Sequence, residues 1–467
     1  MKNKLIIILL LFTLIITSGF GCKRVKKETQ QAMQPIVLNY WRVWDGQDAF
    51  DEIIKNYKAQ HPFITINYRQ LRYDEYEYAL LEALAEDKGP DIFSIHNTWT
   101  KKYQSKIAPM PAETSMVFPV VKGTLKKETF YELRTKKSIT LKELKDTFID
   151  AVYQDVVLPE YNKKEEKLED KIVALPLSVD TLAMYYNKDL LNQAGITEPA
   201  TYWNKELQEH VKKLTKLNSE EKIIQSGINL GGSKNIERYS DILSVLMMQS
   251  GAVMMDDSGK VLFHQIPSAF HENKYSPSVE ALRFYTDFAN PAKEVYSWNN
   301  NLDNSLDMFI QGRLALMLGY SYHLPIIKAR APKLNFSITK LPQIEGSSQA
   351  VNFANYWVET VSKKSKNTEA AWDFLQFMAE ADQIKSYLEK TKKPTALRAL
   401  INEQLEDADI KIFASQLLTA KSWYKGTDSN AAEFAIGEMI DSVNNGQENI
   451  REIIEFGAKK VQETIIR

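Results

Sequence analysis

The sequence lacks the features that mark several common classes of protein. It has one cysteine in 467 residues, so no disulfide can form within the chain. Its formal charge is −1, with 59 basic and 60 acidic residues, which gives no basic excess for binding nucleic acid. Beyond the first twenty residues, no run is apolar enough to cross a bilayer. We therefore expect a globular chain without a membrane span and without a nucleic-acid partner.

Motifs of the common hydrolases are also missing. The sequence has no Gly-x-Ser-x-Gly turn, no His-Glu-x-x-His pair and no second cysteine, and its six histidines are not spaced as metal ligands. A glycosidase needs only two carboxylates, which 60 acidic residues could supply, so a secreted glycoside-processing enzyme stays open as an alternative. The sequence favours a protein that is not an enzyme and needs neither metal nor cofactor.

The N-terminus predicts export. Lys2 and Lys4 form a short basic start, and an apolar run follows from Leu5 to Ile16. That run has the length of a signal-peptide core and is shorter than the ~20 residues that span a bilayer. We predict a signal peptide over residues 1–21.

The lone cysteine, Cys22, stands directly after this signal among small residues. The arrangement resembles the lipobox of bacterial lipoproteins, in which the cysteine becomes the new N-terminus and carries the lipid. One position departs from that pattern, since Gly19 stands where lipoproteins usually have an aliphatic residue. The resemblance implies a lipidated tether over residues 22–35 that holds the protein to the outer face of the cell membrane.

Alternating strand and helix patterns open the folded part. Strands are predicted at 35–40, 64–68 and 91–95, and helices at 50–57 and 73–85, the first capped by Asp48. This β-α-β-α-β order predicts a parallel sheet covered by helices. A less regular stretch follows over 109–171, with charge runs typical of a surface insertion, and further strands are predicted at 172–187, 314–318 and 356–361. We expect the fold class to be α/β, with two lobes.

Aromatic and amide side chains follow several of these strands. Ligands of open parallel sheets bind beyond the carboxyl ends of the strands, so these loops are the predicted site. Trp41 and Trp44 follow the first strand, and we expect one of them in the core and the other in the cleft. Flat rings suit the C–H faces of a sugar, and short polar side chains suit its hydroxyls, because unpaired buried hydroxyls cost about 1–3 kcal/mol each. The sequence therefore predicts a sugar site.

Five segments carry a family resemblance: VLNYWRVWDGQDAFDEIIKNYKAQHPFITINY, GPDIFSIHNTW, ALPLSVDTLAMYYNKDLLNQAGI, MFIQGRLALMLGYSYHLP and NYWVETVSKKSKNTEAAWDFLQFM. They resemble the extracellular solute-binding protein family 1 of ABC transporters, the maltose-binding-protein-like group. In that family the last three segments cross between two lobes.

The resemblance implies a periplasmic-binding-protein-like fold, with two α/β lobes joined by a multi-strand hinge and the ligand in the cleft between them. The N-terminal lobe is then expected from 36–175 with 320–352, and the C-terminal lobe from 176–319 with 353–467. The binding residues carried over by position are Trp41, Trp44, Asn97, Trp99, Asp180, Trp298, Tyr320, Tyr322, Tyr356 and Trp357. Relatives have glycines where this chain has Asn355 and Tyr356, which predicts a reshaped pocket.

The implied function is capture of a sugar or oligosaccharide by hinge closure and delivery to the permease subunits of an ABC importer, by a monomer. Asp180 is expected to accept from ligand hydroxyls, or else to belong to a salt bridge of the hinge. A cationic solute such as a polyamine is the alternative ligand, since tryptophans and Asp180 also suit a cation. A lipoprotein that senses or adheres without a transporter has the same sequence features.

Overall fold

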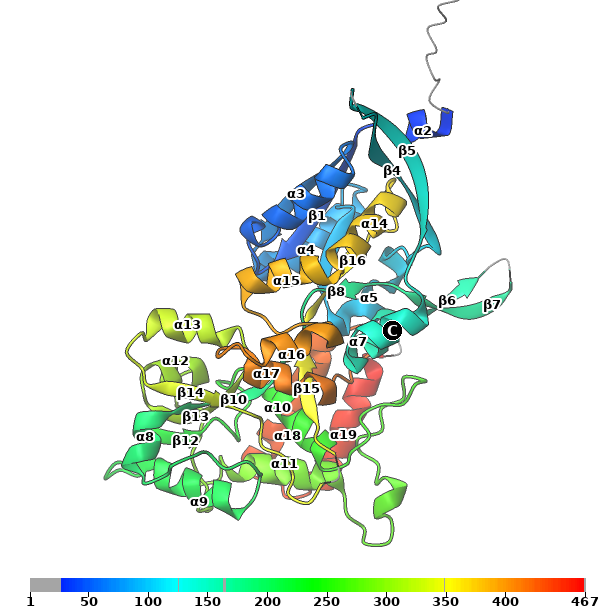
Figure 1. Ribbon diagram of the computed structural model, residues 1–467. Coiled ribbons are helices and arrows are strands. Elements are labelled where there is room, and N and C mark those ends of the chain that lie inside the picture. The colour runs from blue at the N-terminus through cyan, green and yellow to red at the C-terminus, as the bar shows by residue number, and fades with distance from the viewer. Residues whose placement is uncertain (1–26, 125, 163–164, 348, 466–467) are drawn as a thin grey trace, which may run out of the picture.

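The computed structural model describes residues 27–124, 126–162, 165–347 and 349–465. Three parallel strands build its first lobe, the upper one in Figure 1. β1 (Ile36–Val43) pairs with β2 (Ile64–Leu71) and with β3 (Ile92–His96), as predicted. Antiparallel β16 (Trp357–Val361) and β8 (Leu175–Pro176) complete the order β2-β1-β3-β16-β8. Helices that contribute apolar residues to this core include α3 (Asp51–Gln60), α4 (Tyr73–Ala85), α14 (Thr368–Met378) and α15 (Ala381–Thr391).

The start of α3 differs from the prediction. The chain first forms a 3₁₀ turn, η1 (Gln47–Ala49), and α3 begins at Asp51 after Phe50, with no side chain capping it. Asp48 therefore lies inside the 3₁₀ turn and does not cap the helix.

A second mixed sheet forms the second lobe, the lower one in Figure 1. β13 (Leu314–Gly319) lies parallel to β12 (Ile223–Ile228) and antiparallel to β10 (Ala183–Asn187), and β11 (Lys216–Leu217) and β14 (Phe336–Thr339) form the edges. The helices of this lobe are α8 (Lys188–Gln193), α9 (Lys205–Leu214), α10 (Tyr239–Gln249), α11 (Pro277–Asp287), α12 (Ser305–Ile310), α13 (His323–Arg330), α18 (Ser429–Asn444) and α19 (Ile450–Glu463), with the 3₁₀ turn η4 (Ser268–Phe270). The two lobes confirm the expected two-lobed α/β fold.

The chain passes between the lobes three times. It leaves the first sheet after β8 and enters the second at β10, returns through β15 (Asn352–Asn355) into β16, and crosses again between Leu417 and Trp423, which belong to different cores. A three-stranded sheet joins the lobes, with β15 between β9 (Asp180–Thr181) and β17 (Ala420–Lys421). The short elements that lead into the last crossing are η5 (Arg398–Leu400), α16 (Ile401–Gln404), α17 (Lys411–Ser415) and η6 (Leu417–Thr419).

These crossings correct the predicted division of the chain. The segment 320–352 was expected in the first lobe, but Leu324, Ile327 and Leu341 pack in the second core. The strand before it, β13, is buried along its whole length and pairs on both sides within the second sheet, so it does not cross. In turn, most buried apolar residues of 354–417 lie in the first core, with Phe413 in the second, although 353–467 was expected in the second lobe.

The stretch 109–171 is more regular than its charge runs predicted. It forms two hairpins, β4 (Glu113–Lys122) with β5 (Glu128–Lys137) and β6 (Val157–Asn162) with β7 (Lys167–Ile172). Between them lie α6 (Leu141–Thr147) and α7 (Asp150–Val156). Both hairpins project from the first lobe in Figure 1.

The first described residues form a helix, α2 (Lys27–Ala32), which packs against β4 and β5. This part of the predicted tether is therefore folded onto the first lobe, where Thr29 is buried. The predicted signal peptide 1–21 and Cys22 lie outside the described residues. None of the helices in the described part of the chain combines the length and the apolar composition needed to span a bilayer.

Candidate functional site: the cleft between the lobes

Aromatic rings gather at the carboxyl ends of β1 and β3, as the strand order requires. Trp357, at the start of β16, lies 5.5 Å from Trp99, 5.9 Å from His96 and 6.3 Å from Tyr73, measured between ring centroids. Tyr73 in turn stacks on Trp44 at 5.0 Å, with 22° between the ring planes. Trp44 and Tyr73 are 56 % and 51 % exposed, so this row of rings runs from a half-buried end to an open one.

The loop that carries Trp44 is held by buried charges. Asp45 accepts two short bonds from Lys393 Nζ, at 2.6 and 2.8 Å, and pairs with Arg42 at 3.0 Å. Burial would raise the pKa of Asp45, but Arg42 and Lys393 lower it below its usual value. Trp44 itself has φ 72°, a conformation uncommon for a bulky residue. Such a backbone persists only where the surroundings hold it, which this charge cluster does.

The second lobe presents a polar cluster to the cleft. Arg238 donates two bonds to Asp241, at 2.8 and 2.9 Å, and one to Glu433 at 3.2 Å. Burial would lower the pKa of Arg238, but the two carboxylates raise it well above its ordinary range, so it stays charged. Tyr320 donates to Asp241 at 2.6 Å and stacks on Tyr322, which is 38 % exposed. Like Trp44, Arg238 lies in the left-handed region, with φ 58°.

The two sides meet through the hinge strand β15. The amide of Asn355 donates to Asp241 at 3.3 Å, and its carbonyl oxygen lies 3.1 Å from His96 Nε2. Burial, followed by the charge of Arg238, lowers the pKa of His96 to about 4. His96 is therefore neutral near pH 7, and its Nε2 is the donor in this pair. Burial and the negative charge of Glu433 raise the pKa of Tyr73. The carboxylate of the second lobe is therefore close enough to the Tyr73 hydroxyl of the first lobe to affect its ionisation.

A direct bond also joins the lobes. Trp99 Nε1 donates to Ser429 Oγ of α18 at 3.0 Å, and both side chains are buried. The hollow beside this bond leaves only about 30 Å³ for water, room for one or two molecules. Its lining residues are His96, Thr98, Arg238, Ser240, Asp241, Ser244, Phe353, Ala354, Ser422, Trp423, Tyr424, Ser429, Ala432, Glu433 and Ile436. The lobes are thus closed on each other at this level of the cleft.

Asp180 bonds across the hinge rather than forming a salt bridge. Its Oδ2 accepts from the backbone N–H and the hydroxyl of Ser321, at 2.9 and 2.7 Å, and its Oδ1 accepts from the N–H of Thr181. Burial raises the pKa of Asp180 to about 6, although the bonds from Ser321 and Thr181 lower it.

Two other predicted site residues meet at a buried carboxylate of the hinge. Asp155 of α7 accepts from Asn97 at 2.9 Å, from the hydroxyl of Tyr356 at 2.7 Å and from Ser422 at 2.6 Å. Burial raises the pKa of Asp155, and these three donors oppose that rise. Asn97 and Tyr356 are 2 % and 3 % exposed, so the bulk of Tyr356 fills the hinge and does not narrow the cleft.

The structure separates the remaining candidates. Trp298 is fully buried in the second core, where its Nε1 donates to Asn235 at 2.8 Å. Trp41 is half-buried beneath Arg69 of β2, with the guanidinium carbon 4.7 Å from its ring centroid. Trp44, Trp99, Trp357 and Tyr322 are the predicted aromatic residues that lie at the cleft.

Sequence reasoning missed four residues of this cleft. Tyr73 was read only as the start of a helix, and Arg238, Asp241 and Glu433 were not singled out. Arg238 and Asp241 share the i, i+3 spacing of a helical ion pair, which is a common surface signal. No local signal distinguishes this pair from a surface pair, because its other partners, Tyr320, Asn355 and Glu433, lie far away in the sequence. Among the described residues, no group of His, Cys, Asp and Glu is placed to hold a metal ion.

Comparison with known proteins agrees with this architecture. Residues 44–385 match the profile of the bacterial extracellular solute-binding protein family. A putative binding protein of Brucella abortus (strain 2308) is 23 % identical over 80 % of this chain and 79 % of its own length. The galactooligosaccharide-binding protein of Bacillus subtilis (strain 168) is 23 % identical over 67 % of this chain and 65 % of that protein. The maltodextrin-binding protein MdxE of the same organism is 26 % identical over 61 % of this chain and 68 % of that protein.

Solved structures share the fold. A cyclo/maltodextrin-binding protein in complex with maltotetraose has a TM-score of 0.68 at 15 % identity, covering 92 % of this chain and 97 % of that chain. A cyclic alpha-maltosyl-1,6-maltose binding protein from Arthrobacter globiformis has a TM-score of 0.67 at 17 % identity, covering 92 % and 99 %.

Proposed function

Because the chain belongs to the bacterial extracellular solute-binding protein family, we propose that it captures an oligosaccharide between its lobes and delivers it to an ABC importer. The observation that carries the sugar assignment is the row of rings formed by Trp44, Tyr73 and Trp357 opposite the Arg238–Glu433 pair. Rings of this kind cover the C–H faces of sugar units, and the guanidinium and carboxylates of the Arg238 cluster offer donors and acceptors to sugar hydroxyls. Relatives named for galactooligosaccharides and maltodextrin support the same ligand class.

The proposed ligand contacts are divided between the lobes. Trp44, Tyr73 and Trp357 stack on sugar rings from the first lobe, and Tyr322 does so from the second. Asp180 stays a proposed acceptor, since a carboxylate oxygen has two lone pairs. A ligand that touches both sets stabilises the closed form and so drives hinge closure. The narrow hollow near Trp99 requires the lobes to open for loading.

Export and lipid anchoring complete the proposal. We propose that residues 1–21 are a signal peptide and that Cys22 carries the lipid. The protein then works on the outer face of the cell membrane as a monomer that docks on the permease subunits, binding without turnover. Incorporation of radiolabelled palmitate into the chain, and its loss in Cys22→Ser, tests the anchor.

A thermal-shift screen tests the ligand class. Because a bound ligand stabilises only the folded form, a good ligand at 100 times its Kd adds about 2.7 kcal/mol to stability. We expect linear oligosaccharides to raise the melting temperature, with spermidine included as the cationic alternative. Product analysis after long incubation checks that the hit is not cleaved. A shift with spermidine and with no saccharide would contradict the sugar assignment.

A further inference from the structure

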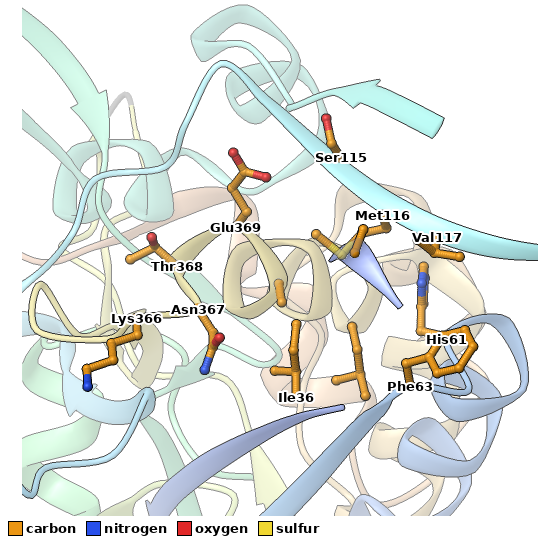
Figure 2. A pocket seen from close by; sticks show the side chains of 13 residues that line it. Ile36, His61, Phe63, Ser115, Met116, Val117, Lys366, Asn367, Thr368 and Glu369 are labelled. Atoms are coloured by element: carbon orange, nitrogen blue, oxygen red, sulfur yellow. The ribbon is translucent and has the colours of Figure 1, made fainter. Parts of the chain in front are cut away.

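The hairpin of β4 and β5 has a base that packs on the lobe and a tip that does not. Its base borders a groove of about 360 Å³ between β4, the first turn of α14 and the start of β1. Figure 2 shows Ser115, Met116 and Val117 of β4 over this groove, with His61 and Phe63 on its other side. From Val121 to Phe130, in contrast, every described residue is exposed. The tip therefore contributes little to the core that the base helps to cover.

The composition of the tip is basic and partly apolar. Lys122, Lys126 and Lys127 are exposed there; Lys122 pairs with Glu132 of β5 at 2.7 Å, and Glu128 is the acidic residue beside the other two lysines. Lys127 forms no ion pair with any described residue, whereas Lys126 and Glu128 make a loose contact at 3.7 Å. The apolar side chain of Val121 at this end of the hairpin is 60 % exposed. Lysines beside exposed apolar groups suit a surface that is anionic outside and apolar beneath.

The N-terminal helix lies beside this hairpin. α2 packs on both of its strands, and in Figure 1 α2 and the hairpin tip lie at the same end of the molecule, far from the second lobe. Four residues lie between Cys22 and Lys27, the first residue of α2, and the five steps of chain between these two residues span at most about 17 Å. If Cys22 carries the lipid, as proposed above, this end of the first lobe cannot move far from the membrane.

We propose that the tip of the β4–β5 hairpin is a second membrane contact, which binds anionic phospholipid next to the lipid anchor. The position of the hairpin tip near the membrane rests on the proposed lipid anchor. The preference for anionic phospholipid rests on the exposed lysines and Val121. Lipid and tip together restrict the tumbling of the first lobe. The second lobe lies at the opposite end of the molecule and stays free to swing as the cleft opens and closes.

Vesicle sedimentation tests this contact without the lipid. The chain from residue 23 to 467 is mixed with vesicles of phosphatidylcholine alone or with about one-third phosphatidylglycerol. Each lysine near an anionic surface contributes about five-fold to binding, so Lys126→Glu with Lys127→Glu should lower the partition coefficient at least about ten-fold. The matched control is Lys333→Glu with Lys340→Glu, two exposed lysines of the second lobe.

We expect binding to the anionic vesicles only, loss of that binding at high salt, no loss in the control, and a smaller loss in Val121→Ser. Equal binding to both kinds of vesicle, no binding to either, or equal losses in the hairpin and control variants would each overturn the proposal. Palmitate labelling and sugar titration are separate measurements. A negative result for the lipid anchor or for sugar binding can therefore be distinguished from a negative result with the vesicles.

Discussion

Removing one hydroxyl at the interface should open the closed form. In Ser429→Ala, the indole N–H of Trp99 loses the acceptor that lies 3.0 Å away. Trp99 and Ser429 are 5 % and 6 % exposed, so bulk solvent does not reach the bond while the lobes are closed. An unpaired buried donor costs about 1–3 kcal/mol, whereas in an open form the same N–H is hydrated. Because 1.4 kcal/mol is a factor of ten, the closing equilibrium should shift by about 5- to 150-fold.

Ligand affinity should fall as well, by at most the same factor. A ligand that contacts both lobes binds tightly only to the closed form, so its apparent Kd rises as that form becomes less populated. Calorimetric titration with the saccharide found by the thermal-shift screen measures this change. Small-angle X-ray scattering without ligand should show a larger radius of gyration for Ser429→Ala than for the unchanged chain.

The matched control is Ser429→Thr, which keeps a hydroxyl at the same place. It should bind the saccharide within about three-fold of the unchanged chain, since a surviving hydrogen bond preserves most of the energy. Melting curves of both variants check that the lobes themselves stay folded. If Ser429→Ala bound with unchanged affinity and scattered identically, the Trp99–Ser429 bond would not contribute to closure, and the reasoning would be refuted.

Three further changes test separate parts of the site. Trp357→Ala should weaken saccharide binding by about 10²-fold in calorimetry, since a central aromatic contact contributes about 2–4 kcal/mol, and unchanged affinity would remove this ring from the site. Asp155→Ala should lower the unfolding free energy by about 2–5 kcal/mol in urea, because three buried donors lose their acceptor. Asp180 has a folded-state pKa raised from 3.8 to about 6, so the native state loses up to about 3 kcal/mol as pH rises from about 4 to 6. Asp180→Asn should lack that loss in melts across this range; identical pH profiles would contradict the raised pKa.

The first sheet could be predicted from the sequence because its signals are local. Each of β1, β2 and β3 lies next to a turn signal and shows apolar residues at strand spacing, and the pairing of consecutive strands through helices follows from the βαβ rule. The site followed in part from the same reasoning. Once the strand order is known, the ends of β1 and β3 must be neighbours, which brings Trp44 and Trp99 to one edge.

The division into lobes could not be predicted in the same way. β13 and β16 are both short apolar strands followed by polar residues, and their own sequences do not indicate which sheet each one joins. Their partners β12 and β3 end 86 and 261 residues earlier, counted from the last residue of the earlier strand to the first of the later one, Ile228 to Leu314 and His96 to Trp357. The hairpin at 113–137 was hidden for another reason. Much of it is exposed, so its apolar residues do not alternate as in a half-buried strand.

Trp298 shows why residue type alone misleads at such a site. It stands in a loop of asparagines that resembles a sugar-binding loop, but its ring is fully buried and its only polar atom is paired with Asn235. Asn355 shows the converse. As a short polar residue on a hinge strand it could have been a simple ligand contact, yet its amide bonds Asp241 of the second lobe and His96 of the first. Rotation of one lobe against the other must alter at least one of these two bonds. The hinge strand is therefore part of the closure energy itself, and a ligand that reaches Arg238 or Asp241 acts on the same set of bonds that holds the lobes together.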